Sequence, residues 1–232
     1  MVRKKGFTLI EAMVIIASLG LIAAVARATY QKAFSEVPPH NAAKDIAEEI
    51  EKGRVVAAKN GSDVWFVFYP AFNHRGNTSN AGRGAVFIFE DTRHDFNAET
   101  GTAPNLYYRE NVGKAFDPIA DATTGPNGKL IDTIFIEDYG DKLRVRLPRG
   151  KIDMGLDEGA FKGLNITKSC SFCTPGGRGA IKVSADKSIQ FFDGDGVAVD
   201  ASTPQTLTII SDGTKRTSIV GIAGGVVSAF KK

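Results

Sequence analysis

The strongest hydrophobic pattern in the chain is an apolar run near the N-terminus. It begins at Phe7, continues to Ala26 and contains a single charged residue, Glu11. About 20 apolar residues are what an α-helix needs to cross the hydrocarbon core of a bilayer. The run therefore predicts a membrane-spanning helix, and a carboxylate within or at the edge of such a helix indicates a functional residue.

The residues before this run predict its orientation. Arg3, Lys4 and Lys5 precede it, and basic flanks of a membrane span stay in the cytoplasm. An ordinary secretory signal has a small-residue cleavage site after its apolar region, whereas here the small residue, Gly6, comes before it. We therefore expect a single-pass inner-membrane protein whose residues after Arg27 lie in the periplasm.

Helical character is expected to continue beyond the apolar run, since residues 28–34 contain no helix breaker. Pro38-Pro39 is expected to interrupt the helix, because proline removes a backbone donor and clashes with the preceding turn. Asn41 is a good N-cap for a second helical stretch, which should end near Asn60-Gly61. The apolar residues of that stretch fall roughly on one face, which predicts packing against a sheet: Ile46, Ala47, Ile50, Ala57 and Ala58.

After Gly61 the pattern changes to short β-rich runs separated by turn sequences. Alternation is clearest in Leu143–Leu147 and Leu207–Ile210, and these runs indicate an antiparallel arrangement. Two long polar, glycine-rich stretches, Phe72–Arg83 and Ala115–Leu130, are expected to be loops. The predicted strands are Val64–Tyr69, Ala85–Glu90, Leu106–Arg109, Thr133–Glu137, Lys142–Leu147, Ala180–Val183, Ser188–Phe192, Gln205–Ser211, Thr217–Gly221 and Gly225–Phe230.

These patterns predict an α+β fold. A long N-terminal helix, membrane-spanning in its first half, would pack on a globular domain made of an antiparallel β-sheet or sandwich. The chain of 232 residues has room for one such domain.

Charge does not indicate a nucleic-acid-binding protein. The formal net charge is +3, from 29 basic and 26 acidic residues. Three of the basic residues lie in the first five positions, which leaves 26 against 26 in the rest of the chain. Any basic surface must therefore come from local clustering.

The chain has two cysteines, Cys170 and Cys173. In an oxidising periplasm they can close a small structural disulfide, which is the interpretation we favour. Free thiols, a redox site and half of a zinc site remain as alternatives. The turn sequence Thr174–Gly177 follows the pair where a thioredoxin-type site would begin a helix, and no histidine is near in sequence.

The N-terminal residues Lys5-Gly6-Phe7-Thr8-Leu9-Ile10-Glu11 resemble the class III signal of type IV prepilins and pseudopilins. The resemblance implies that prepilin peptidase cuts between Gly6 and Phe7 and that the new N-terminal Phe7 is methylated. It also implies that Glu11 pairs with the N-terminus of a neighbouring subunit during assembly.

The order of the later elements is similar to that of the pseudopilin H and minor pilin T group within this family. The resemblance divides the chain into a leader (1–6), a transmembrane and assembly helix (7–27), a helical stalk (28–60) and a periplasmic β-rich domain (61–232). One departure is that the proline which commonly follows the apolar segment is absent, so a kink is expected lower down. The likeness rests on Val86–Asn97 with Leu106–Arg109, on the turn Leu147–Gly150, and on the final strands Ser188–Phe191, Thr206–Ile209 and Ile219–Val227.

Two further sets of residues are weaker candidates for binding sites. Asp91 and Asp95 lie in an acidic loop, and Asp193 and Asp195 alternate as calcium ligands can, although an Asp-Gly turn explains the second pair better. Some minor pilins of the group bind DNA through a basic C-terminal tail, for which this chain offers Lys215, Arg216, Lys231 and Lys232.

The expected function is that of a filament subunit, a minor pilin or pseudopilin, and not an enzyme. No P-loop or nucleophile elbow is present in the sequence, and no cofactor is expected. The expected partners are other pilin or pseudopilin subunits, prepilin peptidase and the inner membrane. A minor pilin that captures DNA or another ligand is the alternative, and a signal-anchored periplasmic enzyme is a third.

Overall fold

The computed structural model describes residues 9–70, 83–94, 96, 129–139, 145–146, 151–155, 165–168, 170–173, 178–211, 216–223 and 225–231. It divides into two compact units, Met1–Val37 and Pro38–Lys232. In the first unit the described residues belong to the helix α1 (Leu9–Asn60), which continues into the second unit.

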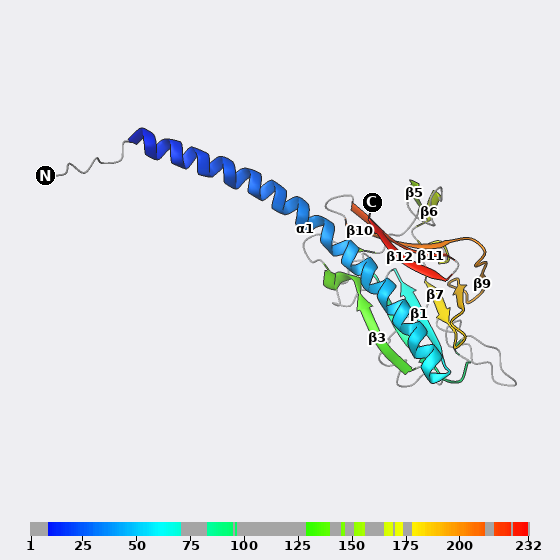
Figure 1. Ribbon diagram of the computed structural model, residues 1–232. Helices are drawn as coiled ribbons and strands as arrows, with labels where there is room; N and C mark the ends of the chain where they lie inside the picture. The colour runs from blue at the N-terminus through cyan, green and yellow to red at the C-terminus, as the bar shows by residue number, and fades with distance from the viewer. Residues whose placement is uncertain are drawn as a thin grey trace, which may run out of the picture. The chain divides into compact units, whose positions relative to one another are not determined.

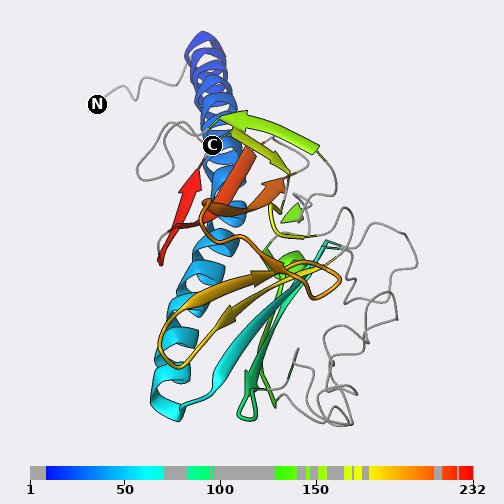
Figure 2. The same cartoon turned by 90° about the vertical axis from the view of Figure 1, so that its right-hand side faces the viewer.

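The second unit contains the rest of α1 and all of the described strands (Figures 1 and 2). In chain order these are β1 (Asp63–Tyr69), β2 (Ala85–Asp91), β3 (Lys129–Phe135), the 3₁₀ helix η1 (Ile136–Tyr139), β4 (Val145–Arg146), β5 (Lys151–Gly155), β6 (Asn165–Lys168), β7 (Gly179–Val183), β8 (Ile189–Phe192), β9 (Ala198–Val199), β10 (Gln205–Ser211), β11 (Arg216–Ala223) and β12 (Val226–Lys231).

The strands form three sheets, and every described pairing is antiparallel. The largest has six strands in the order β3-β2-β1-β7-β8-β9, and the second has four in the order β12-β11-β10-β4. The hairpin β5-β6 forms the third. The strand β1 is buried on both faces from Asp63 to Phe68, which explains why its sequence is a continuous apolar run and does not alternate.

One hydrophobic core joins the helix to both large sheets. Ile46 and Ile50 of α1 pack in the same cluster as Phe66 of β1 and Ile209 of β10, and all four are fully buried. A second cluster lies around Trp65, Phe87 and Phe89, whose positions alternate with those of the first cluster along β1 and β2. The six-stranded sheet is therefore buried on both of its faces.

The end of α1 agrees with the turn predicted at Asn60-Gly61. Gly61 has a φ of 66°, the left-handed conformation that glycine adopts without steric cost. Its N–H donates to the Ala57 carbonyl at 2.9 Å, which satisfies a carbonyl that the helix itself leaves unpaired. After the cap only Ser62 precedes β1, so the chain turns directly from the helix into a central strand of the six-stranded sheet.

The interruption predicted at Pro38-Pro39 is wrong, because α1 is continuous through both residues. Asn41, predicted as an N-cap, is an exposed residue within the helix. A proline inside a helix costs about 3 kcal/mol. Burial of Pro39, Ala42 and Ala43 in the turns that follow favours the helix against that cost.

The predicted fold class is wrong in its helical half. Within the described residues, no helix is both long and apolar enough to cross a membrane. The described apolar side chains run from Ile10 to Ile22, about 20 Å of helix, against a hydrocarbon core of about 30 Å. The structure is instead mostly β, and only the helical residues from Pro38 onward belong to the unit that contains the sheets. The prediction of a single-pass inner-membrane protein is contradicted by the same finding.

Most of the predicted strands are confirmed, with small shifts of their ends. The largest shift is in β3, which starts four residues before the predicted Thr133 and gives way to η1 at Ile136. The predicted strand Leu106–Arg109 lies outside the described residues, as do the predicted loops except Arg83, Lys129 and Leu130. The strands β5, β6 and β9 were not predicted.

Candidate functional site

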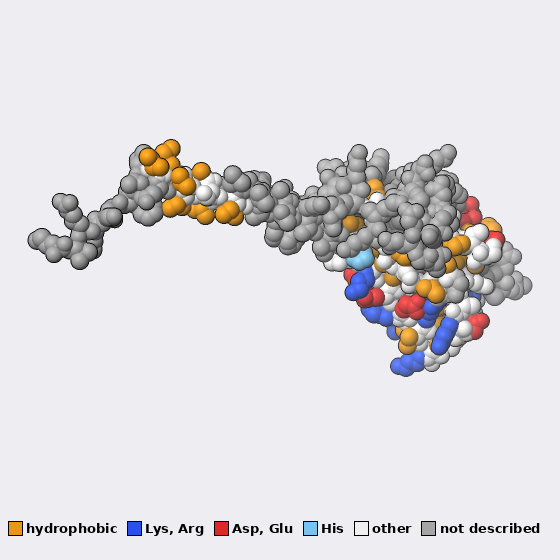
Figure 3. Space-filling model, turned by 45° about the horizontal axis from the view of Figure 1, so that its top comes forward, with side chains coloured by type: hydrophobic (Ala, Val, Ile, Leu, Met, Phe, Trp, Pro, Cys, Tyr) orange, Lys and Arg blue, Asp and Glu red, His pale blue; other side chains and the backbone are white. Residues whose placement is uncertain are grey.

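The N-terminal part of α1 exposes large apolar side chains (Figure 3). Met13, Val14, Ile15 and Ile16 are consecutive, and each is between 45% and 70% exposed. Successive helical residues are about 100° apart, so four of them point to all sides of the helix. The apolar surface is completed by three more side chains, Ile10, Leu19 and Ile22.

Two small residues of this segment, Ser18 and Gly20, interrupt its large apolar side chains. The Ser18 hydroxyl donates to the Val14 carbonyl at 2.8 Å, so its polarity is satisfied within the helix. Gly20 has no heavy atom within 4 Å of where a side chain would begin, so its surroundings are open. A helix that is apolar on every side is normally buried against something.

The predicted processing residues Gly6 and Phe7 lie outside the described residues. Glu11 belongs to α1, one residue after the exposed Ile10 and two before Met13. The backbone therefore places Glu11 within the apolar segment of the helix.

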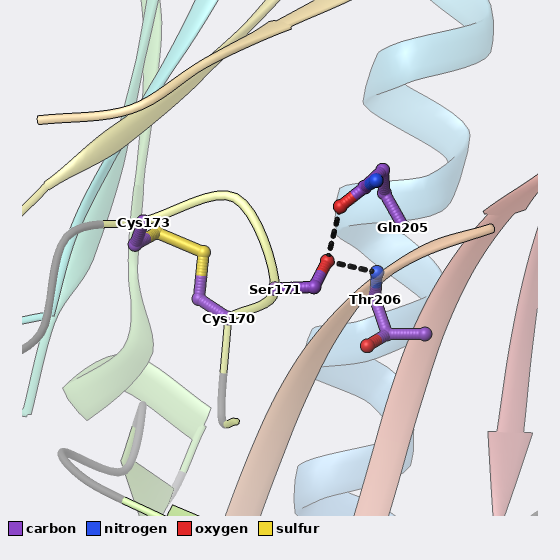
Figure 4. The surroundings of a disulfide bond; sticks show 5 residues. All are labelled: Cys170, Ser171, Cys173, Gln205 and Thr206. Atoms are coloured by element: carbon purple, nitrogen blue, oxygen red, sulfur yellow. Dashed lines mark hydrogen bonds between the residues drawn. A yellow bond between two sulfur atoms is a disulfide. The ribbon is translucent and has the colours of Figure 1, made fainter. Parts of the chain in front are cut away.

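A second candidate is the loop that carries the two cysteines. Cys170 and Cys173 form a disulfide with their Cα atoms 5.3 Å apart, and both are buried (Figure 4). Within the described residues, no group of three or more metal-ligating side chains is present, so no further ligands for a zinc ion lie beside the cysteines there. The Cys pair is a structural link in this state of the protein.

Hydrogen bonds tie this disulfide loop to the start of β10. The Ser171 N–H donates to the Thr206 carbonyl at 3.0 Å, and the Thr206 N–H donates back to Ser171 Oγ at 2.9 Å. The Ser171 hydroxyl donates to Gln205 Oε1 at 2.5 Å, as Figure 4 shows. Cys170 itself forms an isolated bridge with Leu207. The loop thus continues the pairing of the four-stranded sheet at β10.

The other side of the same loop packs on the six-stranded sheet. The Phe172 ring lies 5.6 Å from the Phe68 ring of β1 and 5.4 Å from the Phe191 ring of β8. A Cβ atom at Gly179, the first residue of β7, would lie 2.7 Å from Cys173 Sγ. Only glycine allows this approach, so the disulfide loop is wedged between the two large sheets.

The acidic residues proposed as metal ligands act in turns. The Asp91 carboxylate accepts hydrogen bonds from the Arg93 and Phe96 N–H groups, at 3.1 and 2.9 Å. Asp193 Oδ1 accepts bonds from the N–H groups of Asp195 and Val197, at 3.0 and 2.9 Å, and so shapes the turn between β8 and β9. Asp95 lies outside the described residues.

The basic residues proposed for DNA binding are only partly described. Arg216 pairs with Ser211 at the first position of β11, and Lys231 pairs with Ser218 two positions further along the same strand. The registers therefore bring Arg216 and Lys231 to one end of the four-stranded sheet. Lys215 and Lys232 lie outside the described residues.

Contacts that the sequence did not indicate fasten α1 to the rest of the second unit. The Tyr139 hydroxyl of η1 donates to Asp45 Oδ2 at 2.6 Å, and burial together with this bond raises the pKa of the phenol. Arg54 pairs with Glu51 at 2.9 Å and also donates to the Gly225 carbonyl in the β11–β12 turn. These side chains are ordinary helix-surface residues in the sequence, and nothing in their spacing points to partners so distant in the chain.

Among the residues that the structure describes, grooves lie along the helix in this unit on two sides. One, of about 430 Å³, lies between α1 and β3 and is largely acidic, with Asp45, Glu48 and Asp132 among its lining residues. The other, of about 710 Å³, lies between α1 and β12 and is lined in part by Val55 and Val227. Each groove borders a strand at the edge of its sheet, β3 or β12.

Comparisons with known proteins add no relative: no family model, no curated protein and no solved structure matches this chain.

Proposed function

We propose that this protein is a pilin-like filament subunit, a minor pilin or pseudopilin, which associates with other subunits through the N-terminal part of α1. The observation that carries the proposal is the apolar surface between Ile10 and Ile22, which is exposed on every side of the helix. It overlaps the end of the prepilin-like sequence Lys5–Glu11. A helix of this kind needs surrounding partners, and copies of similar helices in a filament core supply them.

The energetic argument rests on burial of the exposed side chains. Among the side chains that the structure describes, seven large apolar ones on this segment are exposed. Full burial of such a side chain contributes about 1.5–3 kcal/mol relative to water, and these side chains are roughly half exposed to nearly three-quarters exposed. Their combined burial is worth on the order of 10 kcal/mol before the costs of association are subtracted. That is enough to drive assembly. It does not fix how one helix is rotated or displaced relative to the next, because an apolar surface on every side favours no single arrangement.

Glu11 supplies the register under this proposal. A carboxylate that becomes buried among apolar helices without a partner is strongly unfavourable. Cleavage after Gly6 would create a new amine at Phe7, and that amine on a neighbouring subunit can pair with the Glu11 carboxylate. The pair fixes how far one subunit is displaced along the next.

The β-rich unit would then provide contacts between neighbours at the filament surface. The acidic groove beside β3 and the partly apolar groove beside β12 lie on either side of the same helix. Two edge strands and a helix of mixed charge give this unit polar and apolar contact surfaces that do not depend on the N-terminal helix.

The test is incorporation of Glu11→Ala into filaments sheared from cells. We expect the variant to be cleaved normally but to be strongly reduced in the filament fraction. Asp195→Ala is the control, because Asp195 is an exposed carboxylate in the turn between β8 and β9 and lines neither groove. Incorporation of Glu11→Ala at the level of this control contradicts the role given to Glu11.

Binding of DNA is a second candidate function, favoured by one observation. The strand registers bring Arg216 and Lys231 to the same end of the four-stranded sheet, next in sequence to Lys215 and Lys232. A gel-shift titration of residues 29–232 tests it. Binding that weakens with salt and is lost when Lys231 and Lys232 are replaced by alanine supports this function. Binding that does not depend on these two residues contradicts it.

A further inference from the structure

The turn that follows β2 is held against the six-stranded sheet at three points. The first is Asp91, whose carboxylate accepts the N–H groups of Arg93 and Phe96. The second is the Phe96 side chain, 1% exposed, whose ring lies 5.1 Å from Trp65 and 5.3 Å from Phe89. Phe96 thus covers the aromatic cluster around Trp65 on this face of the sheet.

The third point is an ion pair between the turn and the start of β1. His94 Nδ1 lies 2.9 Å from Asp63 Oδ2, and Lys182 Nζ of β7 lies 2.9 Å from the same oxygen. The Asp63 side chain is 4% exposed, whereas the His94 side chain is 50% exposed. A buried carboxylate thus holds one cation from the sheet and one from the turn.

The two cations are not equivalent. Lys182 also lies over the Trp65 ring, 5.8 Å from the centroid. Histidine changes its charge near neutral pH. The charged groups that face His94 are Asp63 of β1, Asp91 at the end of β2 and Lys182 of β7. When His94 is protonated, the charges of these four groups sum to zero. When His94 is neutral, the group carries one net negative charge.

The backbone at His94 gives a second reason why this contact matters. Its φ is 60°, in the left-handed region, which a residue with a side chain adopts only at a cost. Strain of this kind persists where surrounding contacts hold it in place. Here the described contacts are the pair with Asp63 and the hydrogen bonds of Asp91 on either side of it. Weakening the pair therefore favours release of the turn.

We propose that His94 is a pH-dependent clip, which fastens the described residues 91–94 and Phe96 onto β1 and β7 when it is protonated and loosens them when it is neutral. Loosening moves Phe96 away from Trp65 and opens the aromatic cluster beneath it. The hydrogen bond to Asp63, and secondarily the nearby carboxylate charges, raise the pKa of His94 above its ordinary value of 6.5. The clip is therefore closed at and below pH 6.5 and opens as the pH rises through that raised pKa.

The chain supplies its own reporter, because Trp65 is its single tryptophan. Quenching of Trp65 fluorescence by acrylamide, a neutral molecule, is measured on the whole protein from pH 5.5 to 8.5. We expect quenching to rise at least twofold through one transition with a midpoint above 6.5. His94→Gln should remove the transition and leave quenching at the high-pH level throughout. Phe96→Ala should give high quenching at every pH.

Two controls separate this clip from general titration of the protein. His40→Gln and His74→Gln replace the other two histidines and should leave the transition in place. Asp63→Asn should lower its midpoint by removing the carboxylate that favours protonated His94. A transition that survives in His94→Gln, or that is abolished by His40→Gln or His74→Gln, overturns the proposal. So does quenching in the unaltered protein that stays constant from pH 5.5 to 8.5. The clip is independent of filament assembly, so neither result depends on the other.

Discussion

Gly53 of α1 lies directly against the Phe66 ring of β1. A Cβ atom at position 53 would be 2.6 Å from Phe66 Cζ and 3.3 Å from a methyl carbon of Val64. Both of these side chains are fully buried in the core, so neither can move away freely. The glycine is what allows the helix to approach the central strand of the six-stranded sheet.

Gly53→Ala is therefore expected to destabilise the protein even though alanine favours helices. Overpacking of a core costs about 1–3 kcal/mol, which exceeds the gain of about 1 kcal/mol from helix propensity. The urea midpoint of the second unit measures this. Gly20→Ala is the matched control, because nothing lies within 4 Å of that position. A Gly53→Ala protein as stable as this control would contradict the close packing.

The disulfide loop is expected to stabilise the contact between the two large sheets. A closed loop of four residues contributes about 2 kcal/mol by constraining the unfolded chain. Replacing both Cys170 and Cys173 by serine should lower the free energy of unfolding by about that amount or more, because both side chains are buried. Reduction of the unaltered protein with dithiothreitol should lower its urea midpoint in the same direction, and equal stability of both forms would contradict the role.

Ser171→Ala separates the hydrogen bonds of the loop from its covalent link. The variant keeps the disulfide but removes an acceptor for the Thr206 N–H and a donor to Gln205. We expect a loss of about 1–2 kcal/mol, because partly buried polar groups lose their partner. Ser202→Ala is a suitable comparison, since the Ser202 hydroxyl donates to Asp200 in an exposed turn and its loss should cost much less.

The hydrogen bond from Tyr139 to Asp45 is expected to fasten η1 to the helix. Tyr139→Phe removes the donor and should cost about 1–2 kcal/mol, since the acceptor is a carboxylate. A double-mutant cycle with Asp45→Ala isolates the pair, because alanine removes the acceptor. A coupling energy near zero in urea unfolding would show that the two residues act independently.

The stability of the protein should also depend on pH through His94. The pKa of His94 is raised in the folded state, so the ion pair with Asp63 contributes most at low pH. That contribution is complete below about pH 6.5 and is lost as the pH rises through the raised pKa. Urea midpoints between pH 5.5 and 8.5 should fall for the unaltered protein and change less for His94→Gln. If the urea midpoint changes with pH equally in both proteins, the pH dependence of stability does not come from His94.

Much of the sheet architecture could be predicted from local sequence. The strands β1, β2, β7 and β10 follow from apolar runs bounded by turns, and the end of α1 follows from Asn60-Gly61. The strands β5, β6 and β9 have between two and five residues, too few for a hydrophobic period to show. Local pattern also failed at Pro38-Pro39, because the penalty of a proline is local, whereas the packing that offsets it involves residues distant in the chain.

Some features of the candidate sites could also be predicted from local sequence, and others could not. The apolar surface around Met13 and the position of Glu11 within it could be read from the sequence. The partners of Ser171 and Arg54 could not, because Gln205 and Gly225 are more than thirty positions away and carry no recognisable motif. The pairing of His94 with Asp63 joins a turn to the start of β1. It depends on a left-handed backbone at His94, which a histidine in the sequence does not predict. The membrane-spanning helix, which the hydropathy of the sequence favoured, was contradicted.

The most direct test of the pilin-like function is the N-terminus of the protein produced together with active prepilin peptidase. Intact mass and N-terminal sequencing should show a chain that begins at N-methylated Phe7. Gly6→Leu, which removes the small residue before the cleavage point, should leave the chain uncut under the same conditions. A chain that still begins at Met1 or Val2 in the presence of active peptidase would contradict the proposed function.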